Sequence, residues 1–151
     1  MAIRQKTTLT IKMSGKGHSH AHSTTTAGNI TVNIDEPVER GGTNLGFSPT
    51  ETAYSALIGC TNVIGNKCAK KLGVDIGHLS FDMEIDFDRR GVLLMEEVEV
   101  PFKAIRLSVT SDGPCSDEDL QRVATETDKF CPIGKLYINS GTDLKVTWQK
   151  A

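Results

Sequence analysis

Two of the four cysteines stand in sequence contexts that suit thiol chemistry. Cys60 lies within a long, largely apolar stretch, SPTETAYSALIGCTNVIGNKCAKKLG, and Cys131 begins the chain's one Cys-Pro step, in KFCPIG. When two thiols meet, the first can be oxidised to a sulfenic acid and the second can condense with it to a disulfide. A free cysteine is also among the most buried residue types, so core packing of Cys60 stays open as the alternative. Sequence spacing alone does not bring the two thiols together.

An acid and a helix boundary accompany these cysteines. Glu51 precedes Cys60 by nine residues, and at about 100° per residue their side chains point to opposite sides of one helix. Glu51 could therefore act from the helix end, or across a symmetric interface on another copy's cysteine. As the third residue after Ser48, it also fits the acid of a capping box. If a helix begins at Cys131, its dipole would favour the thiolate form of that cysteine.

The remaining cysteines and the histidines are weaker candidates. Cys68 lies about 80° round the helix from Cys60, which favours packing in a core or dimer seam. Cys115 is expected in an exposed turn without a chemical role. In a strand, His18, His20 and His22 would share one face and could hold Zn²⁺, Cu²⁺ or Ni²⁺. A loop would give only weak chelation, and no fourth ligand lies nearby in the sequence, so we expect no metal site.

Composition narrows the class of protein. With 151 residues the chain is most simply one domain, 1–151. A formal charge of −2 gives no general attraction to nucleic acid or to a membrane surface. No apolar run reaches the ~18 residues that span a bilayer, and no signal-peptide core is present, so we expect a cytoplasmic protein with reduced cysteines. The apolar share of 38% is modest, which indicates that a second copy completes the hydrophobic surface.

The elements that must position these residues follow from periodicity and capping. Alternation predicts strands, and helical spacing with an N-cap predicts helices. The polar segment 13–28 is expected to be a loop or a hairpin end. Together these signals predict an α+β fold of order ββα–ββα(α)β with antiparallel sheets. The predicted strands are 7–13, 28–35, 78–87, 104–111 and 142–148; the predicted helices run from Ser48 to Gly73 and from Ser116 to Phe130, with a restart at Pro132.

Two motifs resemble those of the OsmC/Ohr family. The run SPTETAYSALIGCTNVI, with the preceding Gly-Gly of RGGTNLGFSP, resembles the family's first cysteine motif. The later KFCPIGKLYINSGTDLKVTW resembles the second, a Cys-Pro step followed by the final strand. The resemblance covers residues 5 to 149. It implies an OsmC-like fold in which antiparallel sheets wrap around two central helices in an intertwined homodimer, with an active site at each end of the interface.

The resemblance also implies an activity, the reduction of organic hydroperoxides. By position, Cys60 resembles the peroxidatic cysteine and Cys131 the resolving one. Glu51 resembles the acid that orients the active-site arginine. Arg40 resembles the arginine that some members carry before the Gly-rich connection; others carry it in the earlier loop, where this chain has Lys16 and histidines. No bound cofactor is expected, and a dithiol such as a lipoylated protein would regenerate the thiols.

Two other functions remain open at this stage. A dimer-interface cavity lined by thiols could bind a small hydrophobic ligand without turnover. Metal binding through the histidine segment is a third, weaker possibility. Tyr54, Phe47 and Leu45 surround the predicted helix start, so we expect them to form the wall of a pocket.

Overall fold

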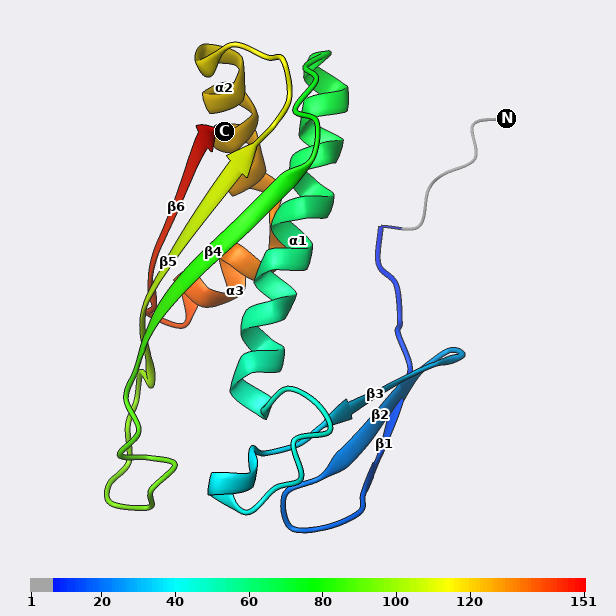
Figure 1. Ribbon diagram of the computed structural model, residues 1–151, viewed down its shortest axis with the longest axis vertical. Helices are drawn as coiled ribbons and strands as arrows, with labels where there is room; N and C mark the ends of the chain where they lie inside the picture. Colours follow the sequence, from blue (N-terminus) through cyan, green and yellow to red (C-terminus); the bar gives the residue numbers. More distant parts are fainter. Residues whose placement is uncertain (1–6) are drawn as a thin grey trace. The chain divides into compact units, whose positions relative to one another are not determined.

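The computed structural model describes residues 7–151, which form two compact units. The N-terminal unit extends to Tyr54 and the C-terminal unit spans Ser55–Ala151, so that α1 begins in the first and continues in the second (Figure 1). The prediction of one domain stays a prediction. The elements in order are β1 (Met13–Gly17), β2 (Ser23–Ala27), β3 (Ile30–Ile34), the 3-10 helix η1 (Val38–Arg40), α1 (Pro49–Leu72), β4 (Leu79–Phe87), β5 (Phe102–Ser111), α2 (Asp117–Phe130), α3 (Pro132–Asn139) and β6 (Asp143–Lys150).

The N-terminal unit is built on an antiparallel sheet of order β1-β2-β3. The prediction of a strand at 7–13 is wrong for nearly all of that segment, because β1 begins only at Met13. The prediction that 13–28 is only a loop or hairpin end is wrong as well, since β1 and β2 both lie in it. A tight turn, in which the His18 N–H donates to the His22 carbonyl at 2.8 Å, sets the register and so fixes which residues pair.

The connection from β3 to α1 is held by a buried carboxylate. Asp35 is fully buried, and its Oδ2 accepts hydrogen bonds from the Thr43 N–H and hydroxyl and from the Leu45 N–H. The Thr43 hydroxyl, ahead of the backbone donors, lowers the pKa of Asp35. Gly42 is required in this loop, because a Cβ there would lie 1.7 Å from the Glu36 carbonyl oxygen. This loop leads directly to the start of α1.

Helix α1 begins and ends as the sequence predicts. Pro49 is its first residue, and Ser48 and Glu51 form the predicted capping box. The helix ends at Leu72, and Gly73 adopts a φ of 70°, where glycine is strongly preferred. Local sequence signals are therefore sufficient to fix both ends of the longest helix.

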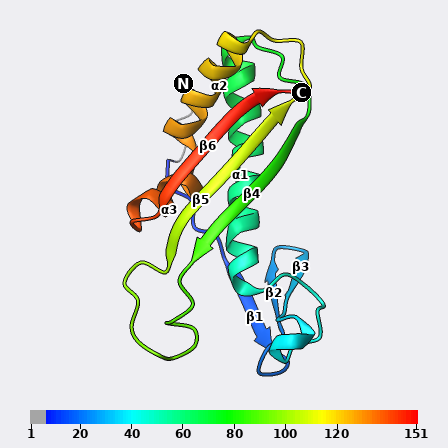
Figure 2. The ribbon, with the colours of Figure 1, turned by 60° about the vertical axis from the view of Figure 1, so that its left-hand side comes forward.

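The C-terminal unit is a three-stranded sheet of order β4-β5-β6 with the helices on one face (Figures 1 and 2). β4 and β5 are antiparallel, whereas β5 and β6 are parallel. This sheet is therefore mixed and not purely antiparallel as predicted, because α2 and α3 carry the chain back across the sheet before β6 begins. The α+β class itself is confirmed.

The hydrophobic core of the C-terminal unit lies between the sheet and the helices. Trp148 of β6 packs directly on α1 at Gly65, where an added Cβ would lie 2.7 Å from the indole ring. None of the helices within residues 7–151 is both long and apolar enough to cross a membrane. The core side chains with at most 1% exposure are Leu57, Ile105, Leu107, Val109, Leu120 and Val123.

Candidate thiol site

Cys60 and Cys131 meet inside the C-terminal unit. The Cys131 thiol donates a hydrogen bond to the Cys60 sulfur, with the two Sγ atoms 3.2 Å apart. Cys60 is half-buried on α1, and Cys131 is only 4% exposed at the junction of α2 and α3. All four cysteines are free thiols. The structure thus joins two residues that are 71 positions apart in the sequence.

The backbone around Cys131 is fixed by its double role as a cap. Its N–H donates to the Thr127 carbonyl at the end of α2, and its carbonyl accepts from the Lys135 N–H in α3. Its Sγ accepts a hydrogen bond from the Gly134 N–H at 3.3 Å. Pro132 occupies the first turn of α3, where its missing N–H is not needed. The helix restart predicted at Pro132 is confirmed. The junction of α2 and α3 holds the Cys131 thiol in one position.

Burial makes Cys131 the thiol that keeps its proton. Loss of solvent, more than any other cause, and the neighbouring Cys60 together raise the pKa of Cys131 to about 11. The Gly134 N–H acts in the opposite direction, as expected at a helix start, but does not prevail. The expectation that a helix N-terminus would favour the thiolate of Cys131 is therefore wrong in its net direction. The direction of the Cys131–Cys60 hydrogen bond agrees with a protonated Cys131.

Glu51 serves as the capping acid of α1. Its Oε2 accepts hydrogen bonds from the Ser48 N–H at 2.8 Å and from the Ser48 hydroxyl at 2.7 Å. The Ser48 side chain, followed by its backbone, lowers the pKa of Glu51, and the positive charge of Arg40 adds a smaller effect. Glu51 is thus held ionised at the first turn of α1, which is the favourable end for a negative charge.

Arg40 lies at the end of η1 in the N-terminal unit. Its Nε donates to Glu36 Oε2 at 2.6 Å, and about half of its side chain (51%) is exposed. An exposed pair of this kind contributes only about 0–1 kcal/mol, so Glu36 does not bind Arg40 strongly. Cys60 belongs to the other compact unit.

Two of the three residues expected to form a pocket wall do so within the N-terminal unit. Leu45 and Phe47 are 60% and 62% exposed and line a hollow of about 520 Å³ together with residues of β3. Tyr54 is buried and does not line this hollow.

The two other cysteines differ in their surroundings. Cys68 is 5% exposed, as its predicted packing role requires, and lines a hollow together with Ile64 and Phe130. Cys115 is half-buried and not fully exposed as predicted.

His18, His20 and His22 lie at the turn between β1 and β2. The rings of His18 and His22 stack with their centroids 4.8 Å apart. His18 Nε2 hydrogen-bonds to the Thr24 hydroxyl, and His22 Nε2 hydrogen-bonds to Asn33 Oδ1. His20 takes part in neither contact. Within residues 7–151, no group of three or more His, Cys, Asp or Glu side chains is arranged to hold a metal ion.

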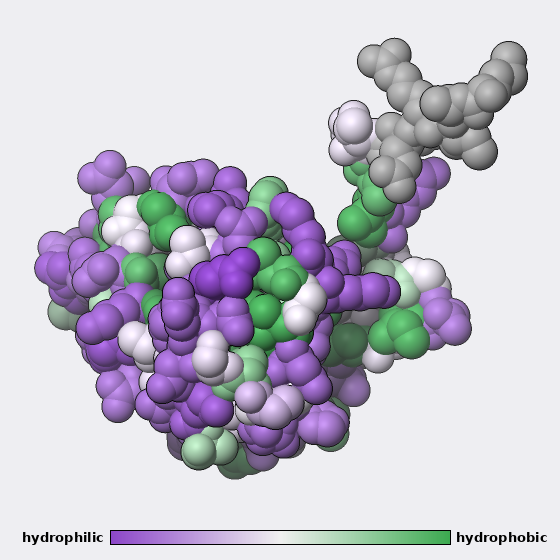
Figure 3. Space-filling view, turned by 90° about the horizontal axis from the view of Figure 1, so that it is seen from above, coloured by the Kyte–Doolittle hydropathy of each residue, from purple (hydrophilic) through white to green (hydrophobic). Residues whose placement is uncertain are grey.

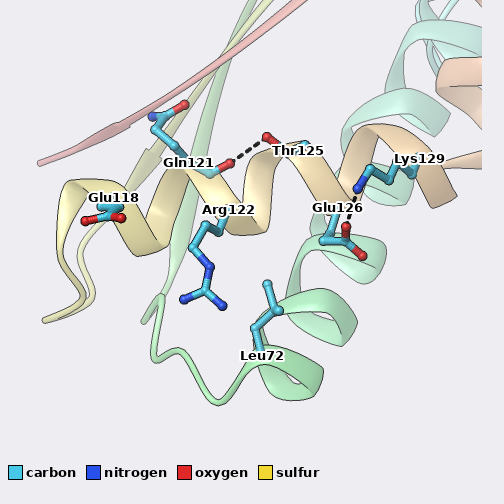
Figure 4. A pocket seen from close by; sticks show the side chains of 7 residues that line it. All are labelled: Leu72, Glu118, Gln121, Arg122, Thr125, Glu126 and Lys129. Carbon is cyan, nitrogen blue, oxygen red and sulfur yellow. Dashed lines mark hydrogen bonds and ion pairs between the residues drawn. The ribbon is translucent and has the colours of Figure 1, made fainter.

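A further hollow of the C-terminal unit is not lined by Cys60 or Cys131. This groove, of about 690 Å³, runs between the end of α1 and α2 and is lined mainly by polar and charged side chains (Figure 4). Figure 3 shows the molecule from above, with hydrophilic side chains surrounding small apolar patches. Glu126 and Lys129 pair within the groove at 2.5 Å. Its lining contains no cysteine, so its size does not make it the chemical site.

Sequence analysis missed a small cavity beside Cys131. Thr61, Thr127 and Asp128 line it together with Cys131. Thr61 directly follows Cys60, and Asp128 precedes Cys131 by one helical turn. The spacing of Asp128 and Cys131 was a usable signal, because residues one turn apart share a helix face.

Comparisons with known proteins agree with this architecture. An OsmC-like protein from Mycoplasma pneumoniae superimposes with a TM-score of 0.79 at 16% identity, covering 95% of this chain and 98% of that one. A Legionella pneumophila protein described as an organic hydroperoxide resistance protein OsmC gives a TM-score of 0.69 at 19% identity, covering 95% and 99%. The organic hydroperoxide resistance protein OhrB of Bacillus subtilis gives 0.65 at 19% identity, covering 93% and 98%.

At these identities the structural matches establish the fold alone. A comparison with curated protein sequences finds no significant match. The family model described as OsmC, OsmC-like protein, matches residues 42–147, which include Cys60, Cys131 and most of the chain. The chain therefore belongs to the OsmC family of proteins.

Proposed function

We propose that this protein is a thiol peroxidase that reduces organic hydroperoxides through Cys60 and Cys131. The observation that carries the proposal is the 3.2 Å contact between the two sulfur atoms. A disulfide requires a sulfur separation of about 2.05 Å, so a shift of roughly 1 Å is sufficient to form the bond. The names of the organic hydroperoxide resistance proteins with the same fold support the choice of substrate class.

In the first step the Cys60 thiolate attacks the peroxide. An S–O bond forms and the O–O bond breaks, the peroxide is reduced to an alcohol by two electrons, and the alkoxide leaving group takes up a proton. Cys60 becomes a sulfenic acid. Cys60 suits this role better than Cys131, because it is more exposed and its sulfur accepts the hydrogen bond between the two thiols.

In the second step Cys131 attacks the sulfenic sulfur of Cys60. The disulfide forms, the Cys131 thiol loses its proton, and hydroxide leaves as water. An external dithiol, such as a lipoylated protein, then reduces the disulfide by thiol exchange and returns both cysteines to thiols. No bound cofactor is needed, since sulfur carries the electrons. Four free cysteines suit a reducing compartment such as the cytoplasm.

Arg40 and Glu51 are proposed to assist at Cys60, by analogy with the family's motif. A guanidinium beside the thiolate would stabilise its charge and bind the peroxide oxygens. The weak exposed pair with Glu36 leaves Arg40 available for this role. Glu51 is held ionised by Ser48 and its pKa already responds to the charge of Arg40, so it can orient that side chain.

A homodimer is proposed because the N-terminal unit exposes a series of large apolar side chains. Exposed apolar residues in such number are typical of an interface. The partner's helix and sheets would cover them, as the intertwined arrangement implied by the family requires. The exposed set among the described residues of this unit comprises Leu9, Ile11, Met13, Ile30, Val32, Val38, Leu45 and Phe47, with exposures from 48% to 78%.

A thiol titration with cumene hydroperoxide tests the proposal. One equivalent should remove two thiols from the reduced wild type, and this loss should be absent in Cys60→Ser. In Cys131→Ser only Cys60 should react, and a dimedone adduct should report its sulfenic acid. Equal slow loss of thiols in all three proteins would rule out the peroxidase.

The second candidate is a binding protein for a small hydrophobic ligand. The hollow of about 520 Å³ with Leu45 and Phe47 in its wall favours it, because its volume suits a drug-sized apolar molecule. Native mass spectrometry of the purified protein should then show a retained ligand that denaturation releases, and the thiols should not respond to peroxide.

A further inference from the structure

The cavity beside Cys131 is large enough for water and carries polar groups that can hold it. Its volume is about 30 Å³, and one water molecule needs only about 10–15 Å³ measured in this way. The Thr127 hydroxyl donates to the Val123 carbonyl at 2.8 Å, so its oxygen can still accept a hydrogen bond from water. Thr61 and Asp128, which also carry polar side chains, line the same cavity. The remaining lining is apolar or glycine.

The resolving step needs a proton acceptor at this place. Cys131 holds its proton in the hydrogen bond to Cys60, and at 4% exposure it has almost no contact with bulk solvent. A thiol attacks as its thiolate, so this proton must leave before or during disulfide formation.

We propose that Asp128 accepts the proton of Cys131 through water in this cavity while Cys131 attacks the oxidised Cys60 sulfur. The inference rests on the proposed roles of Cys60 and Cys131. The S–S bond forms as the leaving group departs from Cys60, and the proton passes from Cys131 to the carboxylate. When the leaving group is hydroxide, it takes up one proton and becomes water.

Asp128 has the position and basicity that this role requires. It lies one helical turn before Cys131 on α2 and lines the same cavity, while the residue as a whole is exposed, so it can release the proton to solvent. Partial burial of its carboxyl raises its pKa, which makes it a stronger base than an ordinary aspartate. Among the described residues that line the cavity, only Asp128 and Cys131 titrate; Cys60 faces Cys131 from α1, and the linings from α3 and β6 are apolar or glycine.

The test uses dithiodipyridine, so that it does not depend on peroxide chemistry. The reagent converts Cys60 to a mixed disulfide, and attack by Cys131 then closes the Cys60–Cys131 bond with release of thiopyridone. Intact mass at successive times separates the two steps. We compare the wild type with Asp128→Asn, and with Glu126→Gln as the control. Glu126 is a carboxylate on the same helix that lies in the large groove and not in the cavity.

We expect Asp128→Asn to slow closure by about 100-fold, the lower end of the range for loss of a general base. Asp128→Glu should restore much of the rate, and Asp128→Asn should approach the wild type as the pH rises toward the pKa of Cys131. If Asp128 had only a structural role, neither the Asp128→Glu variant nor a higher pH would restore the rate of closure. Equal closure in Asp128→Asn and Glu126→Gln would overturn the proposal, as would a wild type that stops at the mixed disulfide. Closure that depends on Asp128, without any reaction with peroxide, would refute the peroxidase and leave the inference intact.

Discussion

The two compact units differ in how completely each is packed. Within residues 7–54 only Asp35, Ser48 and Tyr54 are buried, whereas the C-terminal unit contains a continuous core between its sheet and helices. Apolar side chains occur in both units. In the N-terminal unit they are mostly exposed, as Leu9 and Ile11 show. The C-terminal unit therefore has its own core, and the N-terminal unit requires additional apolar contacts.

This difference corresponds to a division of the proposed chemistry. The C-terminal unit by itself brings the two thiols together, so the proposed disulfide would form between two residues of this unit. The N-terminal unit supplies Arg40 and Glu51, whose proposed effect is on the reactivity of Cys60. We therefore expect changes in the two units to affect different measurable quantities.

The largest contrast concerns the rate of reaction with peroxide. Cys60→Ser should abolish oxidation. Arg40→Ala should slow the oxidation of Cys60 by about 100-fold, the scale for removing one donor that stabilises developing charge, and yet leave closure of the mixed disulfide by Cys131 unchanged. Stopped-flow measurements of both steps check this, with Arg122→Ala as a control for loss of an exposed arginine. A slower closure step in Arg40→Ala would contradict the division.

The second contrast concerns stability. Leu107 is 1% exposed in the core, and Leu107→Ala should lower the free energy of unfolding by about 2–5 kcal/mol. Ile11 is 78% exposed, and at protein concentrations where the chain is monomeric Ile11→Ala should change stability by less than about 0.5 kcal/mol. Urea unfolding at low concentration measures both. Equal losses would mean that the two units are packed alike.

The third contrast concerns association. Ile11→Asp and Val32→Asp place charges among the exposed apolar side chains of the N-terminal unit, and each should shift sedimentation profiles toward the monomer. Glu84→Lys, on the exposed face of β4, should leave the dimer in place. A wild type that sediments as a monomer at all concentrations would disprove the proposed homodimer.

The structure also explains which features the sequence could predict. Both ends of α1, the Ser116 cap and the restart at Pro132 depend on nearby residues, and all were predictable. β1 and β2 were misplaced because strand pairing depends on the partner strand and on the turn between them. The polar alternation of MSGKG carries little hydrophobic signal.

The candidate site could also be predicted from the sequence only in part. Thiol chemistry at Cys60 and Cys131 could be predicted from the residue type and from the resemblance to the family's motifs. The contact between the two thiols could not, because it is set by the packing of α1 against the α2–α3 junction. The dominance of burial over the helix dipole at Cys131 could not be predicted either, since it depends on side chains from other elements. The cavity at Asp128 was not predicted either, although the helical spacing of Asp128 and Cys131 indicates that they share a face.

A smaller contrast concerns the two serine caps. Ser48 is buried and exchanges hydrogen bonds with Glu51, whereas Ser116 is exposed and accepts from the Asp119 N–H. Ser48→Ala should lower stability by about 1–2 kcal/mol and Ser116→Ala by about 0.5–1 kcal/mol. Thermal unfolding of the two variants compares them. A larger loss for Ser116→Ala would show that burial of the Ser48 cap has no added effect.

The smallest expected effect is the pH dependence of the α1 cap. The pKa of Glu51 is lowered from 4.5 in the folded protein, so the ionised carboxylate adds stability above that value. This contribution is lost as the pH falls through the folded pKa. The stabilities of wild type and Glu51→Gln should therefore converge on acidification, and urea midpoints between neutral pH and pH ~3 measure this. A difference in stability that grows toward acid pH would mean that the ionised Glu51 carboxylate destabilises the folded protein.

The central claim is that Cys60 and Cys131 form the redox pair. The most direct measurement is a non-reducing peptide map of the wild type after one equivalent of cumene hydroperoxide, with free thiols alkylated at the quench. The account predicts one linkage, between Cys60 and Cys131, with Cys68 and Cys115 recovered as alkylated thiols. A linkage through Cys68 or Cys115, or a sulfenic acid that persists on Cys60 without a disulfide, would contradict it.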